Sequence, residues 1–360
     1  MTLSWAFLLL AAGLVLLVGG GELLVRGATG LATAMRISPL VIGLTVVAFG
    51  TSSPELAVSV TSAFAGQADV AVGNVIGSNI FNVLFILGVS ALITPLSVSA
   101  RLVRLDVPLM ILASVGLWAF ASSGTLGRFE CAALLSGLIA YLGWTVVQSR
   151  RDAATMAEET AASGMPTWTA WSLCGQIALI VGGLALLTFG SNWLVRGAVE
   201  LARFWGVSEL IIGLTIVAVG TSLPEVATSI LAAVRGQRDI AVGNIVGSNL
   251  FNILGILGIA GLVSRTPITV LDAAIRFDLP VMTAVAVACL PIFFTGHVIA
   301  RWEGALFLGY YFAYTGWLIA TAMGLGGTRT FGLVMVVFVI PLTVVTLVVS
   351  AVRAWRTEKP

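Results

Sequence analysis

Gly50-Thr51-Ser52-Ser53-Pro54-Glu55 and Gly220-Thr221-Ser222-Leu223-Pro224-Glu225 each interrupt a long apolar stretch of this 360-residue chain. Proline removes a backbone hydrogen bond and clashes with the carbonyl one turn earlier, so each apolar helix must break or kink there. Carbonyls freed in lipid are tolerated only where protein or a water-lined cavity covers them, and there they can bind a cation. The two segments therefore predict two broken helices around an ion site.

The composition places the chain in a membrane. Hydrophobic residues make up 59% of it, charged residues make up 9%, and the mean hydropathy is +1.07, which excludes an ordinary soluble domain. Apolar stretches recur at the length of roughly 20 residues that a helix needs to cross a bilayer. The first of these, Leu3–Gly19, lacks a preceding basic residue and a cleavage pattern, so we expect a retained span. These apolar spans predict the lipid bilayer as a partner. The net charge of +2 is spread over short loops and forms no basic patch, so we expect no nucleic acid as a partner.

The chain contains an internal repeat. Leu40–Gly88 aligns with Leu210–Gly258 at a constant offset of 170 without a gap, and 31 of the 49 aligned positions are identical. The similarity continues outward, so residues 170–325 repeat residues 1–148. We count five spans in each half, and an odd number of crossings forces the second copy to enter from the opposite side. Further matches are Leu24–Ala28 with Leu194–Ala198, Arg104–Pro108 with Arg276–Pro280, and Tyr141 and Trp144 with Tyr314 and Trp317.

The expected fold is an all-α membrane protein with two inverted five-helix repeats, ten transmembrane helices in all, and a further C-terminal helix. Residues 149–169 form a polar linker between the repeats, and residues 326–360 hold the eleventh span and a basic tail. The expected spans are 4–24, 38–64, 70–94, 104–123, 128–147, 174–195, 208–234, 240–263, 276–296, 302–323 and 332–352.

Charge and motifs indicate the orientation and the energy source. Most Lys and Arg residues fall on the side that holds the linker and the C-terminus, which predicts these in the cytoplasm of a cell-membrane protein with an outside N-terminus. No G-x-x-x-x-G-K-[ST] motif occurs, so we expect transport driven by an ion gradient, without ATP, cofactor or enzymatic activity. No feature of the sequence specifies an oligomeric state.

Two glutamates lie where lipid-facing charge is most costly. A carboxylate near the bilayer centre costs several kcal/mol, so Glu55 and Glu225 should face the bundle interior and have positive partners. Arginines occur only at the ends of the spans, so no intramembrane Lys or Arg is available for this role. Protons or metal cations remain as the neutralising partners, and a pair of carboxylates ringed by hydroxyls and carbonyls suits hard cations such as Ca²⁺ and Na⁺.

The third span of each half adds polar side chains at helical spacing. Gly73-Asn74-x-x-Gly77-Ser78-Asn79-x-Phe81-Asn82 recurs as Gly243-Asn244-x-x-Gly247-Ser248-Asn249-x-Phe251-Asn252. The serine and the last asparagine of each copy lie one turn apart on one face. The glycines follow the small-x-x-x-small pattern that lets helices approach closely. We therefore expect two broken helices crossed by two closely packed ones, with Asn74 and Asn244 hydrogen bonding across the bundle.

Together, GTSSPE with GNVIGSNIFN and GTSLPE with GNIVGSNLFN resemble the α-repeats of the cation/calcium exchanger superfamily. The resemblance covers about residues 5–323, and the short linker is similar to that of compact prokaryotic sodium/calcium exchangers. It implies a Ca²⁺/Na⁺ antiporter that works by alternating access, with Glu55 and Glu225 coordinating Ca²⁺ and Na⁺ in turn. It further implies hydroxyl or carbonyl ligands at Thr51, Ser52, Thr221 and Ser222, and outer Na⁺ ligands at Ser78, Asn82, Ser248 and Asn252.

One position leaves the coupling ion open. Several exchangers of this superfamily carry aspartate where this chain has Asn252, so only two carboxylates remain at the centre. One Ca²⁺ or two protons would neutralise them, whereas three Na⁺ would overshoot to +1. Proton/calcium exchange at the same site is therefore the alternative. A cation channel lined by the glutamates is a third interpretation, against which the inverted repeat and the broken helices argue.

Overall fold

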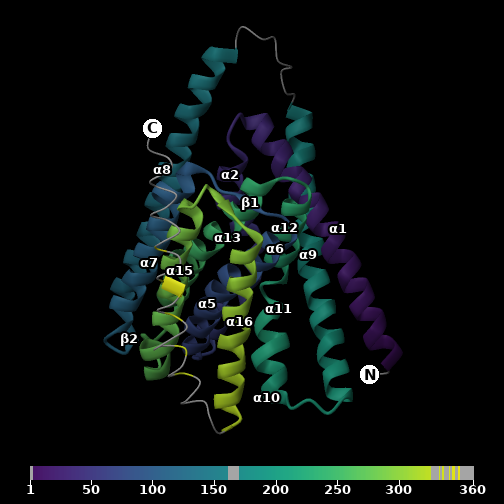
Figure 1. Ribbon diagram of the computed structural model, residues 1–360, viewed down its shortest axis with the longest axis vertical. Helices are drawn as coiled ribbons and strands as arrows, with labels where there is room; N and C mark the ends of the chain where they lie inside the picture. Colours follow the sequence, from purple (N-terminus) through teal and green to yellow (C-terminus); the bar gives the residue numbers. More distant parts are fainter. Residues whose placement is uncertain are drawn as a thin grey trace.

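The structure is a computed structural model that describes residues 3–160 and 170–325, together with positions 332, 335, 340, 343, 344 and 348. The described chain is almost entirely helical (Figure 1). It contains eight helices long and apolar enough to cross a membrane, and ten spans if each of two bent helix pairs counts as one. The prediction of an all-helical membrane protein is confirmed, although four strands of two residues each are also present.

The helices of the first half include three π-helical segments, labelled η, that the sequence did not predict. In chain order the helical elements are α1 (Leu3–Met35), α2 (Pro39–Ile42), η1 (Gly43–Val47), α3 (Ala48–Thr51), α4 (Ser53–Phe64), α5 (Ala68–Phe81), η2 (Asn82–Leu87), α6 (Gly88–Ile93), η3 (Leu102–Asp106), α7 (Val107–Ala121) and α8 (Arg128–Thr160).

The second half repeats this order, with π-helical segments at the matching places. Its elements are α9 (Ala170–Phe204), α10 (Glu209–Ile212), η4 (Gly213–Val217), α11 (Ala218–Gly220), α12 (Leu223–Val234), α13 (Arg238–Leu250), η5 (Phe251–Ile256), α14 (Leu257–Val263), η6 (Ala274–Asp278), α15 (Leu279–Phe294) and α16 (Arg301–Ala322).

Short antiparallel strand pairs join loops of opposite halves. β1 (Leu96–Ser97) pairs with β4 (Val298–Ile299), and β2 (Thr125–Leu126) pairs with β3 (Ile268–Thr269). Figure 1 shows β1 toward the upper end of the molecule and β2 at the lower end, where α1 and α10 begin. We call the lower end the N-terminal face and the upper end, where α8 ends, the linker face. Each face thus has one short strand pair that joins the two halves.

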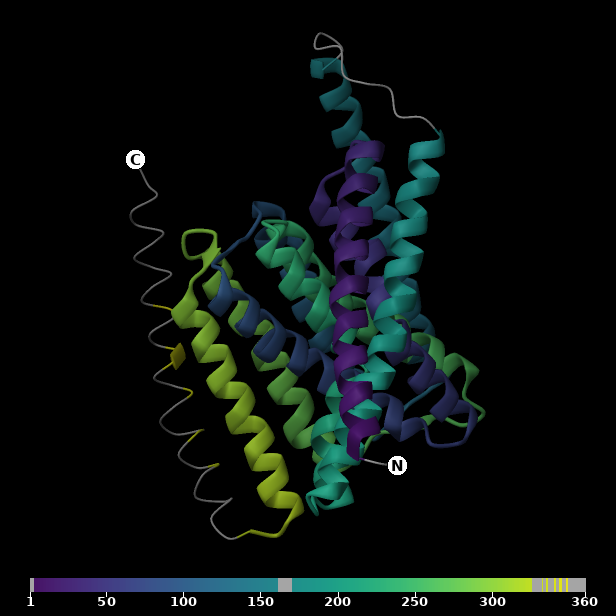
Figure 2. The same cartoon turned by 90° about the vertical axis from the view of Figure 1, so that its right-hand side faces the viewer.

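The longest helix contact joins α1 and α9, which lie side by side in both views (Figures 1 and 2). Glycines recur every seven residues along it. A Cβ atom on Gly20 would lie 2.8 Å from the Gly183 carbonyl oxygen, and one on Gly190 would lie 2.9 Å from that of Gly13, so the backbones touch. The two helices have 33 and 35 residues and exceed the predicted spans 4–24 and 174–195.

Both predicted breaks are present as bends. Ser52 alone separates α3 from α4, and the axes turn by 46° there; the corresponding bend between α11 and α12 is 50°. Pro54 and Pro224 lie in the first turn of α4 and α12, where a helix needs no backbone N–H donor. The prolines therefore start a new helix in each span, and the chain bends without a long unwound loop.

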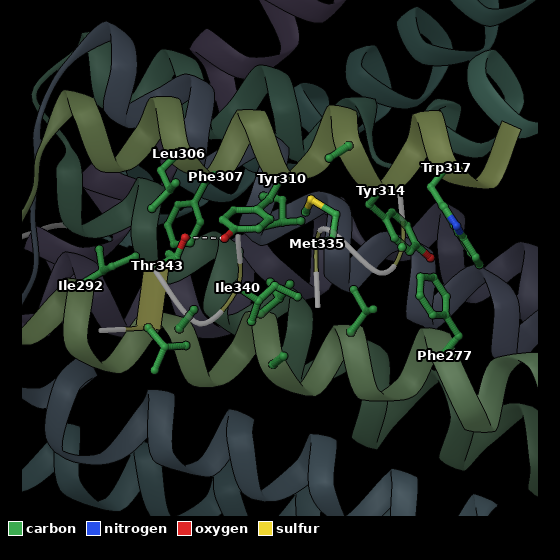
Figure 3. A pocket seen from close by; sticks show the side chains of 18 residues that line it. Phe277, Ile292, Leu306, Phe307, Tyr310, Tyr314, Trp317, Met335, Ile340 and Thr343 are labelled. Atoms are coloured by element: carbon green, nitrogen blue, oxygen red, sulfur yellow. Dashed lines mark hydrogen bonds between the residues drawn. The ribbon is translucent and has the colours of Figure 1, made fainter. Parts of the chain in front are cut away.

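The predicted linker and eleventh span are only partly described. α8 continues as a helix to Thr160, so the first part of the linker extends the fifth span, and residues 161–169 lie outside the described chain. Most of span 332–352 lies outside it as well. Five of the six described positions of that span, Met335 and Ile340 among them, border a cavity of about 260 Å³ between α15 and α16 (Figure 3). The described lining of this cavity has no charged side chain, so it is not the expected ion site.

Candidate cation site between the bent helices

The two bends bring the glutamates of opposite halves together. Glu55 and Glu225 stand in the first turns of α4 and α12, and each is only 1% exposed. The Ser52 hydroxyl donates a hydrogen bond to Glu225 Oε1 at 2.7 Å, and the Ser222 hydroxyl donates one to Glu55 Oε1 at 2.8 Å. Each half therefore holds the carboxylate of the other, and both carboxylates belong to one site.

The second oxygen of each carboxylate is free for another ligand. Oε2 of Glu55 and Oε2 of Glu225 are buried and have no hydrogen-bond partner among the described residues. No ion pair to either glutamate occurs in this part of the chain, and it contains no group of three or more His, Cys, Asp or Glu side chains arranged to hold a metal. Two buried carboxylates without a cationic side chain require cations or protons for neutrality.

Serine hydroxyl groups lie beside the carboxylates. The Ser78 and Ser222 hydroxyl oxygens lie 3.3 Å apart, which places Ser78 beside the Glu55 carboxylate that Ser222 binds. Thr221 Oγ1 and Ser248 Oγ are buried and have no partner among the described residues. Thr51 differs, because its hydroxyl donates to Asn244 Oδ1 at 3.0 Å. That contact ties α3 to α13 across the two halves.

Asn82 and Asn252 carry buried amide oxygens. Both side chains are 1% exposed, and each begins or lies within the π-helical turn after α5 or α13. Their Oδ1 atoms are buried without a partner among the described residues. The ten predicted site residues thus lie at or just after the two bends or in the α5–η2 and α13–η5 segments, and six of them carry a buried side-chain oxygen without a hydrogen-bond partner among the described residues.

Further side chains hold the bent helices in place. The Asn74 amide donates to the Glu55 carbonyl at 3.2 Å and to Ser59 Oγ at 3.0 Å, and Asn244 donates to Ser229 Oγ at 3.0 Å. The predicted role of Asn74 and Asn244 in hydrogen bonding across the bundle is confirmed. Sequence reasoning missed Ser59 and Ser229, although they match at the repeat offset of 170.

A second pair of acids lies outside the site. The Tyr141 hydroxyl donates to Asp106 Oδ1 at 3.0 Å, and the Tyr314 hydroxyl donates to Asp278 Oδ1 at 2.9 Å. Asp106 is fully buried and also faces Arg101, whose Nε lies 3.5 Å from Oδ2. The repeated R-x-D-x-P motif and the repeated tyrosine noted in the sequence therefore contact each other in each half.

The two halves pack differently around the site. A Cβ on Gly43 would lie 3.0 Å from the Ile240 carbonyl oxygen, and one on Gly243 would lie 3.0 Å from that of Leu40, so η1 and α2 press on α13. At the equivalent Gly213 and Gly73, no atom would lie within 4 Å. Residues of η1 are buried, whereas η4 contains no buried residue. The glycine prediction is thus confirmed for α13 and wrong for α5 in this conformation.

Comparisons with known proteins agree with this architecture. The family model described as sodium/calcium exchanger protein matches residues 5–147 and 175–320. The inner membrane protein YrbG of Escherichia coli (strain K12) is 39% identical over 288 residues, which cover 78% of this chain and 86% of YrbG. The sodium/calcium exchanger MaX1 of Methanosarcina acetivorans is 32% identical over 340 residues, which cover 86% of this chain and 97% of MaX1.

A solved structure shares the fold. The sodium-calcium exchanger NCX_Mj, soaked with zero Na⁺ and Ca²⁺, superposes with a TM-score of 0.74 at 28% identity, covering 89% of this chain and 99% of that one. The resemblance inferred from the two α-repeats is confirmed. This chain is a multi-pass membrane protein that belongs to the sodium/calcium exchanger family.

Proposed function

We propose that this protein is a secondary active antiporter that exchanges Ca²⁺ for Na⁺ at the site between the bent helices. The observation that carries this proposal is the exchange of serine–glutamate hydrogen bonds between Ser52 and Glu225 and between Ser222 and Glu55. It aligns two buried carboxylates and leaves one oxygen of each without a partner among the described residues. A desolvated, preorganised pair of this kind binds a hard divalent cation through oxygen alone.

The proposed ligands are oxygens of the residues at the two bends and of the segments that pack beside them. Carboxylate, hydroxyl and amide oxygens suit Ca²⁺ and Na⁺ and offer no soft ligand for a transition metal. Glu55 and Glu225 would bind Ca²⁺ and Na⁺ in turn, because these two carboxylates are the only negative charges that the proposed site offers to either ion. The remaining ligands in the proposal are Thr51, Ser52, Thr221, Ser222, Ser78, Asn82, Ser248 and Asn252.

Alternating access follows from the proposed inverted repeat of residues 1–148 and 170–325, five spans each, with the C-terminal segment outside it. Since α2 and η1 pack on α13 while η4 leaves α5 uncovered, we take the linker face as closed and the N-terminal face as open, and exchange of these two arrangements would open the linker face. In this proposal α1 and α9 move together over the site, because the glycines along their contact bring the two backbones into close packing. We place the N-terminus outside the cell membrane and the linker and C-terminus in the cytoplasm, so Ca²⁺ leaves the cell as Na⁺ enters.

Proton-coupled calcium transport at the same site is the second candidate. The observation that favours it is that Asn82 and Asn252 are both amides, so the core of the site carries two negative charges. Two protons or one Ca²⁺ balance these charges, and three Na⁺ leave an excess of one. The relatives named as exchangers lend no support to the channel alternative.

Calcium uptake into proteoliposomes tests both candidates. Vesicles loaded with Na⁺, and vesicles loaded with acidic sodium-free buffer, are diluted into ⁴⁵Ca²⁺, with Glu55→Gln as the blank. Asp272→Asn is the matched control, because that carboxylate is exposed on the surface. Uptake that requires internal Na⁺ supports sodium coupling, and uptake driven by the proton gradient alone supports the second candidate. Gradient-dependent uptake that persists in Glu55→Gln would overturn the proposed site.

A further inference from the structure

Four asparagine side chains form a buried cluster between the two halves. Asn79 and Asn82 come from α5 and the start of η2, and Asn249 and Asn252 come from α13 and η5; all are at most 2% exposed. The side-chain NH₂ group of Asn79 donates to the backbone carbonyl of Asn249 at 3.4 Å. The side-chain NH₂ group of Asn249 donates to the backbone carbonyl of Asn79 at 3.4 Å. The central asparagines, Asn79 and Asn249, thus hold each other across the interface.

The orientation of the two central amides is fixed chemically. The Asn79 NH₂ group also points to Met282 Sδ at 3.6 Å, and the Asn249 NH₂ group points to Met110 Sδ at 3.5 Å. A backbone carbonyl and a thioether can only accept hydrogen bonds, so an NH₂ group must face them. An amide turned the other way would set its oxygen against two acceptors. Oδ1 of each central asparagine therefore faces away from its methionine.

These oriented oxygens set the next pair of amides. Oδ1 of Asn249 accepts a hydrogen bond from the Asn82 NH₂ group at 3.0 Å, and Oδ1 of Asn79 accepts one from the Asn252 NH₂ group at 3.1 Å. With their NH₂ groups held in this way, Asn82 and Asn252 turn their own oxygens elsewhere. Those oxygens are the buried atoms without a partner among the described residues.

We propose that Asn249 and Asn79 are positioning residues that fix the amides of Asn82 and Asn252 with their oxygens toward the transported cation. The inference rests on the proposed function, since it concerns the ligands of that site. A carboxylate offers an oxygen in either orientation, but an amide turned by 180° presents NH₂ and repels a cation. Because this chain has amides at both positions, it needs a device that selects one orientation. The relays Met110–Asn249–Asn82 and Met282–Asn79–Asn252 are that device.

A double-mutant cycle tests the first relay by calorimetric Ca²⁺ binding to the purified full-length protein. Asn249→Leu removes the acceptor for the Asn82 NH₂ group, and we expect Ca²⁺ affinity to fall about tenfold. In an Asn82→Asp background the same change should cost about twofold or less, because the carboxylate needs no orientation. Asn252→Asp is the matched control background. Its residue is oriented by Asn79, so the full loss on Asn249→Leu should persist there.

The outcomes separate positioning from a structural role. An equal loss in the Asn82 and Asn82→Asp backgrounds, or no loss at all, would overturn the proposal, because a role in packing does not depend on residue 82. Met110→Leu keeps the side-chain volume and removes only the acceptor, so it gives a second cycle if Asn249→Leu elutes as aggregate from a sizing column. Wild-type ⁴⁵Ca²⁺ uptake in the same preparation tests the proposed function alone. Binding that obeys the cycle in a protein without gradient-driven uptake would support the relay and reject the antiporter.

Discussion

Ser52 donates a hydrogen bond of 2.7 Å to Glu225, a residue 173 positions away in the other half of the chain. The reciprocal bond from Ser222 to Glu55 means that neither half can complete a carboxylate site alone. A movement of one half relative to the other must change the surroundings of both carboxylates together. In the proposed mechanism, this geometry would couple both carboxylates to any movement of the helices that opens or closes the site.

Removal of either serine hydroxyl should weaken the site. We expect Ser52→Ala and Ser222→Ala each to raise the KM for Ca²⁺ about tenfold, because a hydrogen bond to a charged group contributes roughly 1.5–3 kcal/mol. The measurement is initial ⁴⁵Ca²⁺ uptake over a range of calcium concentrations. Ser53→Ala is the matched control, since the Ser53 hydroxyl is exposed and donates to the Phe49 carbonyl. Equal effects of Ser52→Ala and Ser53→Ala would contradict the assignment.

Addition of a methyl group to the α1–α9 contact should destabilise the protein. A Cβ on Gly183 would lie 2.7 Å from the Gly20 carbonyl oxygen and 2.7 Å from the Leu24 nitrogen, both of them backbone atoms. We expect Gly183→Ala to cost about 1–3 kcal/mol of stability and to lower the thermal denaturation midpoint in detergent. Its neighbour is the control, because Gly182 has no atom within 4 Å of a Cβ and Gly182→Ala should be neutral or slightly stabilising.

The difference between the two faces can be measured by cysteine labelling. In a Cys174→Ser background, a membrane-impermeant thiol reagent added on the N-terminal side should modify Gly73→Cys and Gly77→Cys rapidly. Both glycines are exposed and have no atom within 4 Å of a Cβ. Gly243→Cys should be protected, because Gly243 itself packs against α2, where a Cβ would lie 3.0 Å from the Leu40 carbonyl oxygen. Equal labelling rates at Gly73→Cys and Gly243→Cys would show that the sealed and open faces are wrongly assigned.

The buried ion pair of the first half should matter for stability. Asp106 is fully buried and pairs with Arg101, which also lies 5.5 Å from the Trp144 ring centroid. We expect Arg101→Leu to destabilise the protein by about 3 kcal/mol, because the change leaves a buried carboxylate without its cation. Arg104→Leu, at an exposed position of η3, is the control. A denaturation midpoint that falls equally in both variants would argue against the pair.

Much of this protein could be predicted from its sequence because the signals are local. The length of each apolar stretch determines that it crosses a membrane, and Pro54 and Pro224 determine where two spans bend. The internal repeat at an offset of 170 identifies Glu55 and Glu225 as equivalent acids. They are expected to be buried, and no intramembrane Lys or Arg is available to neutralise them. The α-repeat motifs identify the family. None of these inferences requires knowledge of which helix packs against which.

The tertiary structure decided everything that depends on a partner distant in sequence. The sequence shows that Ser52 and Glu55 lie one turn apart, but only packing reveals that Ser52 binds Glu225 of the other half. The matching motifs that begin at Gly73 and Gly243 are packed differently: a Cβ on Gly243 would touch α2, whereas one on Gly73 would meet no atom within 4 Å. A single conformation can close only one face. The orientation of Asn82 depends on Asn249 and, through it, on Met110 of another helix. Periodicity fixes the face a side chain occupies, whereas its hydrogen-bond partner is set by the neighbouring helix.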